Sequence, residues 1–483
     1  MKILASLCKD MYKEFHQKAY HPDVSEVYIN FTNRSGRYSN TGLDGVVFVG
    51  LQYFIKSYLQ DAWGEFFNTK KEQVIAEHKR VVSAILGFDV DVEYLAKLHD
   101  LGYLPLEIKA LEEGTLVPYQ VPNLTIRNTI DGFGWLPNMI ETQLSACIWG
   151  VSTSATTSMA YLKKFLEYSN KTCANDLSVP FQGHDFSYRG MFGMEASALS
   201  GFGHLCSGLV GTDSIPAVIF AEQYYNADLE NSLVGASVNA TEHSVTCSWQ
   251  DEGEYEFFKT LIEQTPKGQI LSLVSDTWDY WGLLLNTLPK LKNLIEYQDI
   301  KVVIRPDSGD PVDIICGYRK DKGSVEVLWD IFGGTINDKG YKVLSDSIGL
   351  IYGDSITLDR QDEILSKLEK KGFASSNVVL GIGSYTYQYV TRDTHGSAVK
   401  ATSIIKKGIR KSIFKHPKTD SNKKSSKGLF FVNKNFELEQ DVSFEKEQLS
   451  GNMLKIVYKN GKLIKETSLN NIRKVIHTFI KIG

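Results

Sequence analysis

The sequence predicts an α/β protein with an irregular, barrel-like α/β catalytic domain and a second, smaller α+β domain. Three observations lead to this prediction. Short apolar runs recur in the middle of the chain, a helix-patterned segment separates two of them, and polar or small residues follow each run. Continuous apolar strands that alternate with helices are typical of a parallel sheet covered by helices. A length of 483 residues leaves room for two or three domains.

Four runs in the middle of the chain are expected to be strands. Each ends in a small polar cluster, and they are QILSLVSD (269–276), KVVIRPDSGD (301–310), GLIYGDS (349–355) and NVVLGIGS (377–384). Between the last two lies LDRQDEILSKLEKKG (358–372), which is expected to be a helix. Ile364, Leu365 and Leu368 share one face of it, and Gly372 can end it.

The N-terminal part of the chain predicts three further elements. VVFVGLQYFIKSY (46–58) is apolar and aromatic and should be buried. TKKEQVIAEHKRVVSAILGF (69–88) has the apolar spacing of a helix and ends at Gly87. In MKILASLCKD (1–10) the apolar run is too short for a signal peptide, and we expect a buried strand there.

Charged and small residues gather where the predicted strands end, and this placement points to catalysis. The carboxyl ends of parallel strands carry the site in α/β folds. A purely structural protein has no reason to place acids and an arginine repeatedly at that edge. The residues concerned are Asp276, Asp279, Arg305, Asp307, Asp354 and Gly383.

Composition excludes several classes of protein. A net charge of -4 and a pI of about 6.2 are unlike a dedicated nucleic-acid binder, which is more often basic. The six cysteines are far apart and form no C-x-x-C pair, so we expect reduced thiols and no zinc site. No apolar stretch is long enough to span a bilayer. We therefore expect a cytoplasmic protein without a membrane or nucleic-acid partner.

The segment from Lys400 to Lys427 differs from the rest of the chain. It holds ten Lys or Arg and one acid, Asp420. It can be a solvated loop, or a cover that supplies cations to a polyphosphate. Nucleic-acid binding ranks below both, because no nucleic-acid motif accompanies the run.

Four short clusters carry the residue types of a reactive site. Each residue has an ordinary structural explanation when taken alone. His243 could be a structural histidine, Phe186 a core residue, Asp213 a turn cap and Arg305 half of an ion pair. The clusters are HDFSYRG (184–190), GTDS (211–214), SVNATEHS (237–244) and RPDSGDP (305–311).

In this order and spacing, the clusters resemble nicotinamide phosphoribosyltransferases, a family related to the nicotinate phosphoribosyltransferases. The resemblance covers nearly the whole chain. It includes VFVGLQY (47–53), DKGYKVL (338–344), GDS (353–355), VTRD (390–393), FKHPKTDSNKKSSKG (414–428) and VYKNGKLIKETSLNNIRK (457–474). It implies a phosphoribosyltransferase barrel domain of residues 1–24 and 130–399, and a flanking α+β domain of residues 25–129 and 400–483.

The reaction implied is transfer of phosphoribosyl from phosphoribosyl pyrophosphate to nicotinamide, which gives nicotinamide mononucleotide and pyrophosphate in NAD salvage. Such a site must hold a flat neutral ring, neutralise a departing polyanion and bind Mg²⁺. The resemblance assigns the nicotinamide to Phe186 on one face and to Tyr12 of a second subunit on the other. Arg305 and Asp213 would bind the carboxamide, and Ser275 would line the same region.

The resemblance assigns further residues to the phosphoribosyl group and its phosphates. Asp307, Gly353 and Asp354 would bind the ribose, and Gly383, Ser384 and Arg392 the 5′-phosphate. The remaining phosphate-binding candidates are Arg189, Lys400, Lys415, Lys423 and Arg34.

His243 matches the histidine that this family phosphorylates with ATP, so ATP is expected as an activating co-substrate. Asp279 would orient the imidazole, and Asp279 and Asp307 would bind Mg²⁺, partly through water. The predicted catalytic residues are therefore His243, Asp279, Asp307 and Arg305. The resemblance also implies a homodimer with shared sites.

The chain departs from the family pattern at two positions. Ser384 stands in GIGSYTY where a further glycine is usual, and Gly36 stands where a second basic residue follows Arg34. Both changes bear on affinity for the donor.

Two rival functions remain. A nicotinate phosphoribosyltransferase would place a carboxylate against Asp213, a like-charge clash. A non-catalytic nucleotide-binding relative would be expected to lose charged site residues, which this chain retains.

Overall fold

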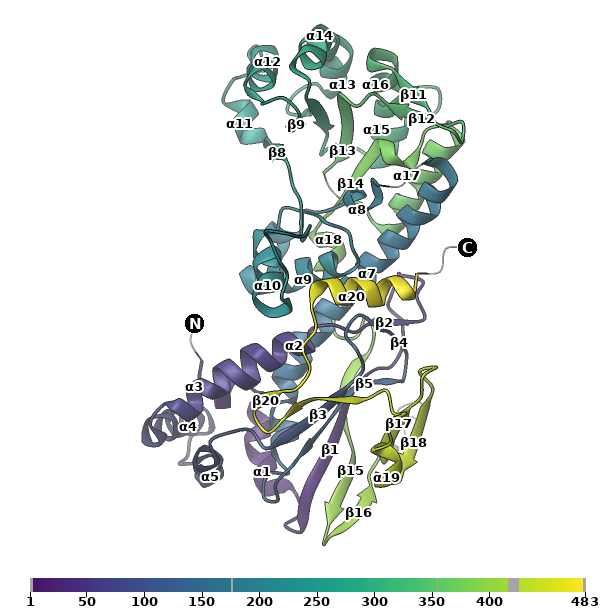
Figure 1. Ribbon diagram of the computed structural model, residues 1–483. Helices are drawn as coiled ribbons and strands as arrows, with labels where there is room; N and C mark the ends of the chain where they lie inside the picture. The colour runs from purple at the N-terminus through teal and green to yellow at the C-terminus, as the bar shows by residue number, and fades with distance from the viewer. Residues whose placement is uncertain (1–2, 175–176, 354, 416–424, 481–483) are drawn as a thin grey trace. The chain divides into compact units, whose positions relative to one another are not determined.

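The computed structural model describes residues 3–174, 177–353, 355–415 and 425–480, which divide into two units (Figure 1). The first unit comprises residues 1–156, 223–227 and 391–479, and the second comprises residues 157–222, 228–390 and 480–483. Residues 1–24, 130–156, 223–227 and 391–399, which the resemblance assigned to the barrel domain, lie in the first unit.

The second unit is built on a seven-stranded parallel sheet in the order β7-β6-β14-β13-β10-β9-β8. The four strands predicted in the middle of the chain are confirmed as β9, β10, β13 and β14. The strands are β6 (Gly183–Asp185), β7 (Gly211–Thr212), β8 (Asn239–Ala240), β9 (Ile270–Val274), β10 (Lys301–Arg305), β13 (Ile348–Tyr352) and β14 (Val378–Ile382).

The two edges of this sheet are connected by one extended segment. Ala236 forms a parallel bridge with Gly211 of β7, and its N–H donates to the Val210 carbonyl at 2.7 Å. A few residues later the same segment enters β8, where Asn239 pairs with Leu271 of β9. The sheet therefore curls into the barrel-like form that the sequence predicts, and neighbouring strands follow one another in chain order.

The predicted helix after β13 is confirmed as α17 (Leu358–Lys370). Ile364, Leu365 and Leu368 are buried, and Gly372 beyond its end has a φ of 76°. The other helices that lie mainly in this unit are α8 (Val179–Gln182), α9 (Met194–Cys206), α10 (Ile215–Tyr225), α11 (His243–Cys247), α12 (Glu254–Gln264), α13 (Tyr280–Gly282), α14 (Leu288–Gln298), α15 (Pro311–Cys316), α16 (Ser324–Phe332) and α18 (Ser384–Tyr387).

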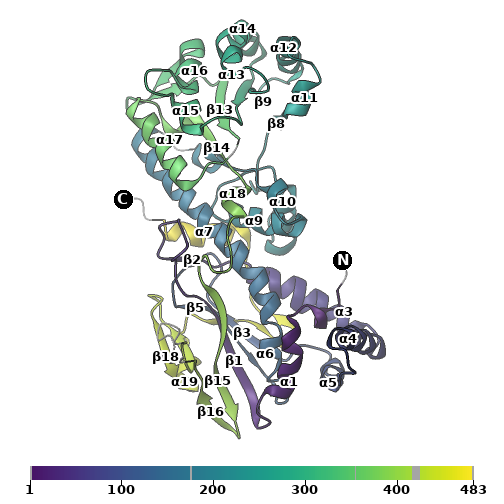
Figure 2. The same cartoon turned by 180° about the vertical axis from the view of Figure 1, so that it is seen from behind.

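The first unit contains a seven-stranded antiparallel sheet that joins the two ends of the chain. β1 and β15 lie side by side although more than three hundred residues separate them, with Phe31 opposite Val399 (Figures 1 and 2). In sheet order the strands are β16 (Ile409–Ser412), β15 (Ser397–Lys406), β1 (Val24–Asn33), β5 (Pro122–Asn128), β3 (Leu106–Ala110), β19 (Lys455–Lys459) and β20 (Lys462–Leu463). The basic segment from Lys400 thus begins within this sheet.

Helices complete the first unit. Those of eight or more residues are α4 (Lys71–Leu86), α5 (Glu93–Leu101), α20 (Leu469–Thr478) and the π-helical η3 (Phe54–Ala62), and α7 (Glu141–Thr172) begins here. The predicted helix of residues 69–88 is confirmed as α4, and Gly87 ends it with a φ of 78°. The predicted burial of residues 46–58 is confirmed for most of that segment.

The strand predicted at the N-terminus is wrong. Ala5–Leu7 form a 3-10 turn instead, closed by the Leu7 N–H on the Leu4 carbonyl at 2.8 Å. The hydroxyl of Ser6 lies 2.8 Å from Nδ1 of the buried His78. The apolar run therefore packs against α4 as a turn, because it is held by the His78 side chain and not by a neighbouring strand.

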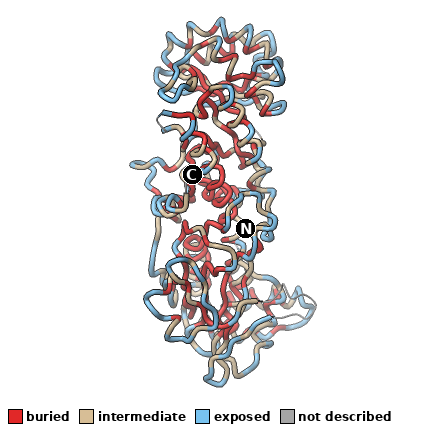
Figure 3. Tube along the Cα trace, turned by 90° about the vertical axis from the view of Figure 1, so that its right-hand side faces the viewer, coloured by how far each residue is buried: buried red, intermediate tan, exposed pale blue. Residues whose placement is uncertain are grey.

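Buried stretches, red in Figure 3, alternate along the chain with exposed ones, and the strands β3, β5 and β13 are buried throughout. All of the cysteines carry free thiols, as predicted. Among the residues that the structure describes, no helix has both the length and the apolar character to cross a membrane.

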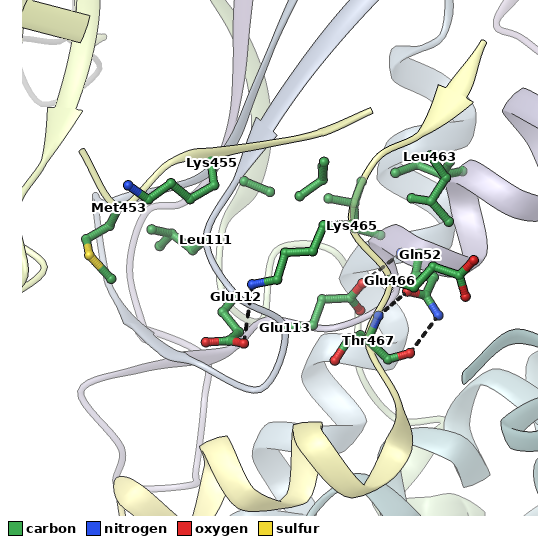
Figure 4. A pocket seen from close by; sticks show the side chains of 14 residues that line it. Gln52, Leu111, Glu112, Glu113, Met453, Lys455, Leu463, Lys465, Glu466 and Thr467 are labelled. Carbon is green, nitrogen blue, oxygen red and sulfur yellow. Dashed lines mark hydrogen bonds and ion pairs between the residues drawn. The ribbon is translucent and has the colours of Figure 1, made fainter. Parts of the chain in front are cut away.

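A small cavity of about 190 Å³ lies in the first unit and is lined in part by the buried carboxylate of Glu113 (Figure 4). Glu113 accepts hydrogen bonds from the N–H groups of Gly50 and Gln52, both at 2.7 Å, and from the Tyr225 hydroxyl at 2.9 Å. Burial raises the pKa of Glu113 to about 6, although these hydrogen bonds oppose the shift. Glu113 therefore fixes the start of α2 (Leu51–Tyr53), the segment that leads into η3.

We expect Glu113→Gln to destabilise the first unit. The new amide must turn its NH₂ group toward one of the N–H or O–H donors, so at least one hydrogen bond is lost and two donors face each other. The expected cost is about 1–3 kcal/mol. Glu112→Gln is the matched control, because the neighbouring Glu112 is exposed and lies only 3.5 Å from Lys465 at the cavity rim. Denaturant unfolding of both variants measures the difference, and equal stabilities would contradict the assignment.

Candidate active site

A cavity of about 760 Å³ opens in the second unit where the parallel strands end. Its walls come from the segments that follow β6, β7, β8, β10, β13 and β14. Most of the residues predicted for the barrel domain meet there, and they are Phe186, Arg189, Asp213, His243, Arg305, Asp307, Gly353, Gly383 and Ser384. The curled sheet thus gathers side chains that are up to about 200 positions apart in the sequence.

Phe186 and Arg305 form one wall of the cavity. The guanidinium carbon of Arg305 lies 5.9 Å from the centre of the Phe186 ring, within cation–π range. One Arg305 amino group donates to the Thr241 carbonyl at 2.9 Å, and Nε lies 3.8 Å from Asp307. Only 13% of the Arg305 side chain is exposed. The cation is therefore held in one orientation beside the aromatic face.

Asp213 is held by two polar neighbours on the same oxygen. The Ser237 hydroxyl donates to Oδ1 at 2.6 Å, and Nε2 of His184 lies 2.9 Å from it. Burial alone would raise the pKa of Asp213, but these two groups and the charge of Arg305 outweigh it and lower the pKa below its usual value. Asp213 is thus an ionised acceptor at neutral pH.

His243 stands at the start of α11, and 45% of its side chain is exposed. Nδ1 lies 3.1 Å from the Thr277 hydroxyl, while Nε2 lies 3.6 Å from Asp276 and 3.8 Å from Asp307. The expected partner, Asp279, instead caps α13 by accepting from the Gly282 N–H at 2.9 Å. The structure therefore brings Asp276 and Asp307, rather than Asp279, to the imidazole.

Asp276 also organises the segment after β10. Its side chain is almost wholly buried, and Oδ2 accepts from the N–H groups of Asp307 and Ser308 at 2.9 and 2.7 Å. Ser275 lies beside it without exposure, bonded to the Leu273 carbonyl at 2.6 Å. The Ser275 N–H donates to the Arg305 carbonyl at 3.0 Å, so the predicted Ser275 links the ends of β9 and β10 instead of lining the cavity.

The departure at Ser384 has a structural explanation. A side chain at Gly190 would begin 2.0 Å from the Ser384 hydroxyl oxygen, so Gly190 leaves the space that Ser384 fills. Both residues line the cavity, and Ser384 is the first residue of α18. The extra side chain is therefore accommodated by the opposite segment.

The remaining described candidates lie in the first unit, where they form a cationic cluster of Arg34, Arg392, Lys400 and Lys415 with Tyr12 beside it. Burial lowers the pKa of Lys400; Glu141 opposes this, and the charges of Arg34, Lys415 and Arg392 lower the pKa further. Tyr12 is 62% exposed, and Arg392 acts on its hydroxyl. Within the described residues, none of the four cations makes an ion pair. Such a cluster is suited to an anion.

Two of the predicted residues, Asp354 and Lys423, lie outside the described residues. Other residues of the site were not predicted from the sequence. Those with contacts to the predicted ones are His184, Ser237, Thr241 and Thr277, and Asp276 was expected near the site but without a contact to His243. All of them stand in or beside the clusters that the sequence singled out, so proximity in the chain was the available signal.

The acidic residues offer little for a dedicated metal cage. Within the described part of the chain, no group of three or more His, Cys, Asp or Glu side chains is arranged to hold a metal ion. Of the two predicted ligands, Asp307 lines the cavity and Asp279 does not. Magnesium commonly takes one or two carboxylates and completes its shell with water and substrate phosphates. Asp307 fits that mode of binding.

The comparisons with known sequences agree on one family. Residues 181–462 match the nicotinate phosphoribosyltransferase (NAPRTase) family. The chain is 48% identical to a nicotinamide phosphoribosyltransferase of Acinetobacter baylyi, over 96% of this chain and 95% of that one. It is 34% identical to a nicotinamide phosphoribosyltransferase of Mycoplasma pneumoniae, over 88% and 94% of the two chains.

Solved structures share the fold at low sequence identity. Human nicotinic acid phosphoribosyltransferase has a TM-score of 0.58 at 14% identity, covering 97% of this chain and 93% of that one. A nicotinate-nucleotide pyrophosphorylase from Pyrococcus furiosus has the same TM-score at 15% identity, covering 99% and 95%. These likenesses concern the two-domain fold alone.

Proposed function

The chain belongs to the nicotinate phosphoribosyltransferase (NAPRTase) family, and from this membership we propose that it is a nicotinamide phosphoribosyltransferase. It transfers phosphoribosyl from phosphoribosyl pyrophosphate to nicotinamide and releases nicotinamide mononucleotide and pyrophosphate. The observation that favours nicotinamide over nicotinate as the substrate is the ionised Asp213 near Arg305 and Phe186. Its free thiols suit the reducing conditions of the cytoplasm, where we place it.

Recognition of nicotinamide rests on complementary hydrogen bonding. The Phe186 ring supplies an aromatic face, Arg305 donates to the carboxamide oxygen, and Asp213 accepts from the carboxamide NH₂. A nicotinate carboxylate cannot donate to Asp213, and it would bring a second negative charge to a carboxylate that is already ionised. Such a like-charge contact costs several kcal/mol, so nicotinate is the weaker candidate substrate.

The reaction forms a bond between the nicotinamide ring nitrogen and the anomeric carbon while the bond to pyrophosphate breaks. Positive charge develops on the sugar and negative charge on the leaving group. Asp307 would bind the ribose hydroxyls, while Arg189 would help to neutralise the leaving phosphates. Bound Mg²⁺ would supply further charge neutralisation, with Asp307 as its best-placed protein ligand.

We further propose a homodimer with shared active sites. The barrel cavity is lined by residues of the second unit, whereas Tyr12, Arg34, Arg392 and Lys400 cluster in the first. A second subunit can supply its Tyr12 and cations to the cavity, and a C₂ pair provides two equivalent sites. The exposed Tyr12 ring would then cover the free face of the nicotinamide.

ATP is proposed as an activating co-substrate that phosphorylates His243. The imidazole is exposed enough to be reached, and Thr277 on Nδ1 leaves Nε2 directed toward Asp276 and Asp307. A phosphohistidine there would add negative charge beside the ribose-binding carboxylate, so its effect would depend on the cations and Mg²⁺ that accompany the donor.

Mass spectrometric detection of nicotinamide mononucleotide tests the function. Purified protein is mixed with nicotinamide, phosphoribosyl pyrophosphate and Mg²⁺, with and without ATP. We expect product in both reactions and more of it with ATP. Protein that binds the donor but releases no pyrophosphate would instead support the non-catalytic relative.

We expect Asp213→Asn to weaken the preference for nicotinamide over nicotinate by at least about tenfold, because the like-charge repulsion disappears. The measurement is kcat/KM for each substrate. Asp338→Asn, which removes an exposed carboxylate of the same unit, is the control and should leave the ratio unchanged. Equal use of both substrates by the wild type would rule out this role for Asp213.

We expect His243→Ala to remove ATP stimulation and the phosphohistidine but to retain slow basal synthesis. His21→Ala serves as the control, since His21 is an exposed histidine of the first unit. ATP hydrolysis, acid-labile phosphate on the protein and a melting curve are measured together. ATP turnover that survives in His243→Ala would show that another group accepts the phosphate.

A further inference from the structure

We propose that His395, Tyr119 and Gly36 form a neutral clamp that positions Arg34 next to the turn carrying Arg392, and so sets affinity for the phosphoribosyl donor. The three residues are called the clamp below. This inference rests on the proposed function, because it takes Arg34 and Arg392 as phosphate-binding residues.

The backbone of His395 connects the segment that carries Arg34 to the turn that carries Arg392. Its carbonyl accepts from the N–H groups of Arg34 and Ser35, at 3.1 and 3.3 Å. Nε of Arg34 donates to the Gly396 carbonyl at 2.9 Å. The same turn bonds back to Arg392, whose carbonyl accepts from the Ser397 N–H at 3.0 Å. Arg34 is therefore tied, through main chain and side chain, to the turn that holds Arg392.

The side chain of His395 is fixed by Tyr119. The Tyr119 hydroxyl lies 3.0 Å from Nδ1 of His395, and the two rings stack with centres 6.1 Å apart and planes 25° apart. His395 is 1% exposed, so this contact is made in the interior. Tyr119 follows β4 (Leu116–Pro118), which makes it a support from a third segment of the first unit.

Gly36 is the condition for this arrangement. A Cβ atom at position 36 would lie 2.5 Å from the Tyr119 hydroxyl oxygen, closer than any side chain permits. The chain departs from the family pattern at this position, where a basic residue is usual. Because Gly36 has no side chain, it leaves the space that Tyr119 occupies. Glycine at this position therefore lacks the cation of the family pattern but allows a rigid support for Arg34.

Electrostatics explains why the support has to be neutral. Arg34, Arg392 and Lys415 all act on Lys400, so like charges crowd this part of the unit and repel one another. Burial lowers the pKa of His395 to about 4, which keeps the imidazole uncharged at neutral pH. The clamp thus holds the arginine segments together without adding to the repulsion, and it leaves their charge available to an anion.

The test compares single-atom and single-residue changes in the full-length protein. Tyr119→Phe removes the hydroxyl alone, and Gly36→Ala adds one methyl group against it. Tyr38→Phe is the matched control, because Tyr38 stands in the same segment as Gly36 and is 66% exposed. KM for phosphoribosyl pyrophosphate, KM for nicotinamide and kcat are measured, with a melting curve for each variant.

We expect Tyr119→Phe and Gly36→Ala to raise KM for the donor by about three- to tenfold, which is the size of one hydrogen bond. KM for nicotinamide and kcat should stay within about twofold, and Tyr38→Phe should behave as the wild type. A general structural role would instead shift every parameter together. Unchanged donor KM in both folded variants would overturn the clamp.

A double-mutant cycle makes the inference sharper. If the clamp acts through Arg34, then Tyr119→Phe should have no further effect on donor KM in an Arg34→Ala background. Fully additive effects would overturn the inference even though nicotinamide mononucleotide is formed. A wild type that forms none would contradict the proposed function itself, so the two failures are separate results.

Discussion

Arg305→Ala should lower kcat/KM for nicotinamide by about a hundred- to a thousandfold, the loss typical of one preorganised charged donor. Arg305 is fixed by the Thr241 carbonyl, lies over Phe186 and faces Asp307. Its removal takes away the donor to the carboxamide oxygen and the positive charge that faces Asp307. Initial rates of nicotinamide mononucleotide formation measure the loss.

Arg305→Lys should recover little of this activity. A lysine is a compact point charge, so it cannot bond the Thr241 carbonyl and present a second planar N–H group to the ligand. Arg80→Ala is the control, because Arg80 is an exposed arginine on α4 of the first unit. A folded Arg305→Lys variant with near wild-type kcat/KM would mean that only charge matters at this position.

Mixing Tyr12→Ala with Arg305→Ala should give more activity than either variant has alone. Random exchange of equal amounts makes half of the dimers mixed, and one of the two sites in each mixed dimer is free of both lesions. Up to about a quarter of wild-type activity is therefore expected from a C₂ dimer. Loss of Tyr12 alone removes one of two aromatic faces, each worth about 0.5–1.5 kcal/mol beyond area burial.

Phe186→Ala mixed with Arg305→Ala is the matched control for this experiment. Both residues line the same barrel cavity, so every site in the mixed dimers keeps one lesion and no activity should return. Native mass spectrometry of differently tagged chains establishes that exchange took place. Exchange without recovery in the Tyr12 mixture would place Tyr12 in the site of its own chain, or outside the site.

The strands and the clusters at their ends could be predicted from the sequence because the signals are local. Each of β9, β10, β13 and β14 is a continuous apolar run, and a strand buried on both faces needs no alternation to be recognised. The carboxyl ends of parallel strands lie at the same edge of the sheet, so the residues that follow the strands are expected to lie close together. Of the residues predicted at strand ends, Arg305, Asp307 and Gly383 line one cavity, whereas Asp279 does not.

The contacts that set each role could not be predicted in the same way. Asp279 was expected to orient His243, but the turn after β9 brings Asp276 to the imidazole instead, because Asp279 is used to cap α13. The N-terminal apolar run was expected to be a strand, since its pattern cannot show that Ser6 meets His78 on a helix far along the chain.

The sequence by itself determined the fold class, the family resemblance and the set of chemically active side chains. These follow from short-range patterns and from motifs whose order is preserved. Only the tertiary structure decided that Tyr12 and Arg392 belong to the unit of Arg34 and not to that of the barrel cavity, and that Gly36 makes room for Tyr119. Both findings depend on distances between segments that are far apart in the sequence. Side-chain packing sets those distances, and it produces no periodic pattern from which they could be predicted.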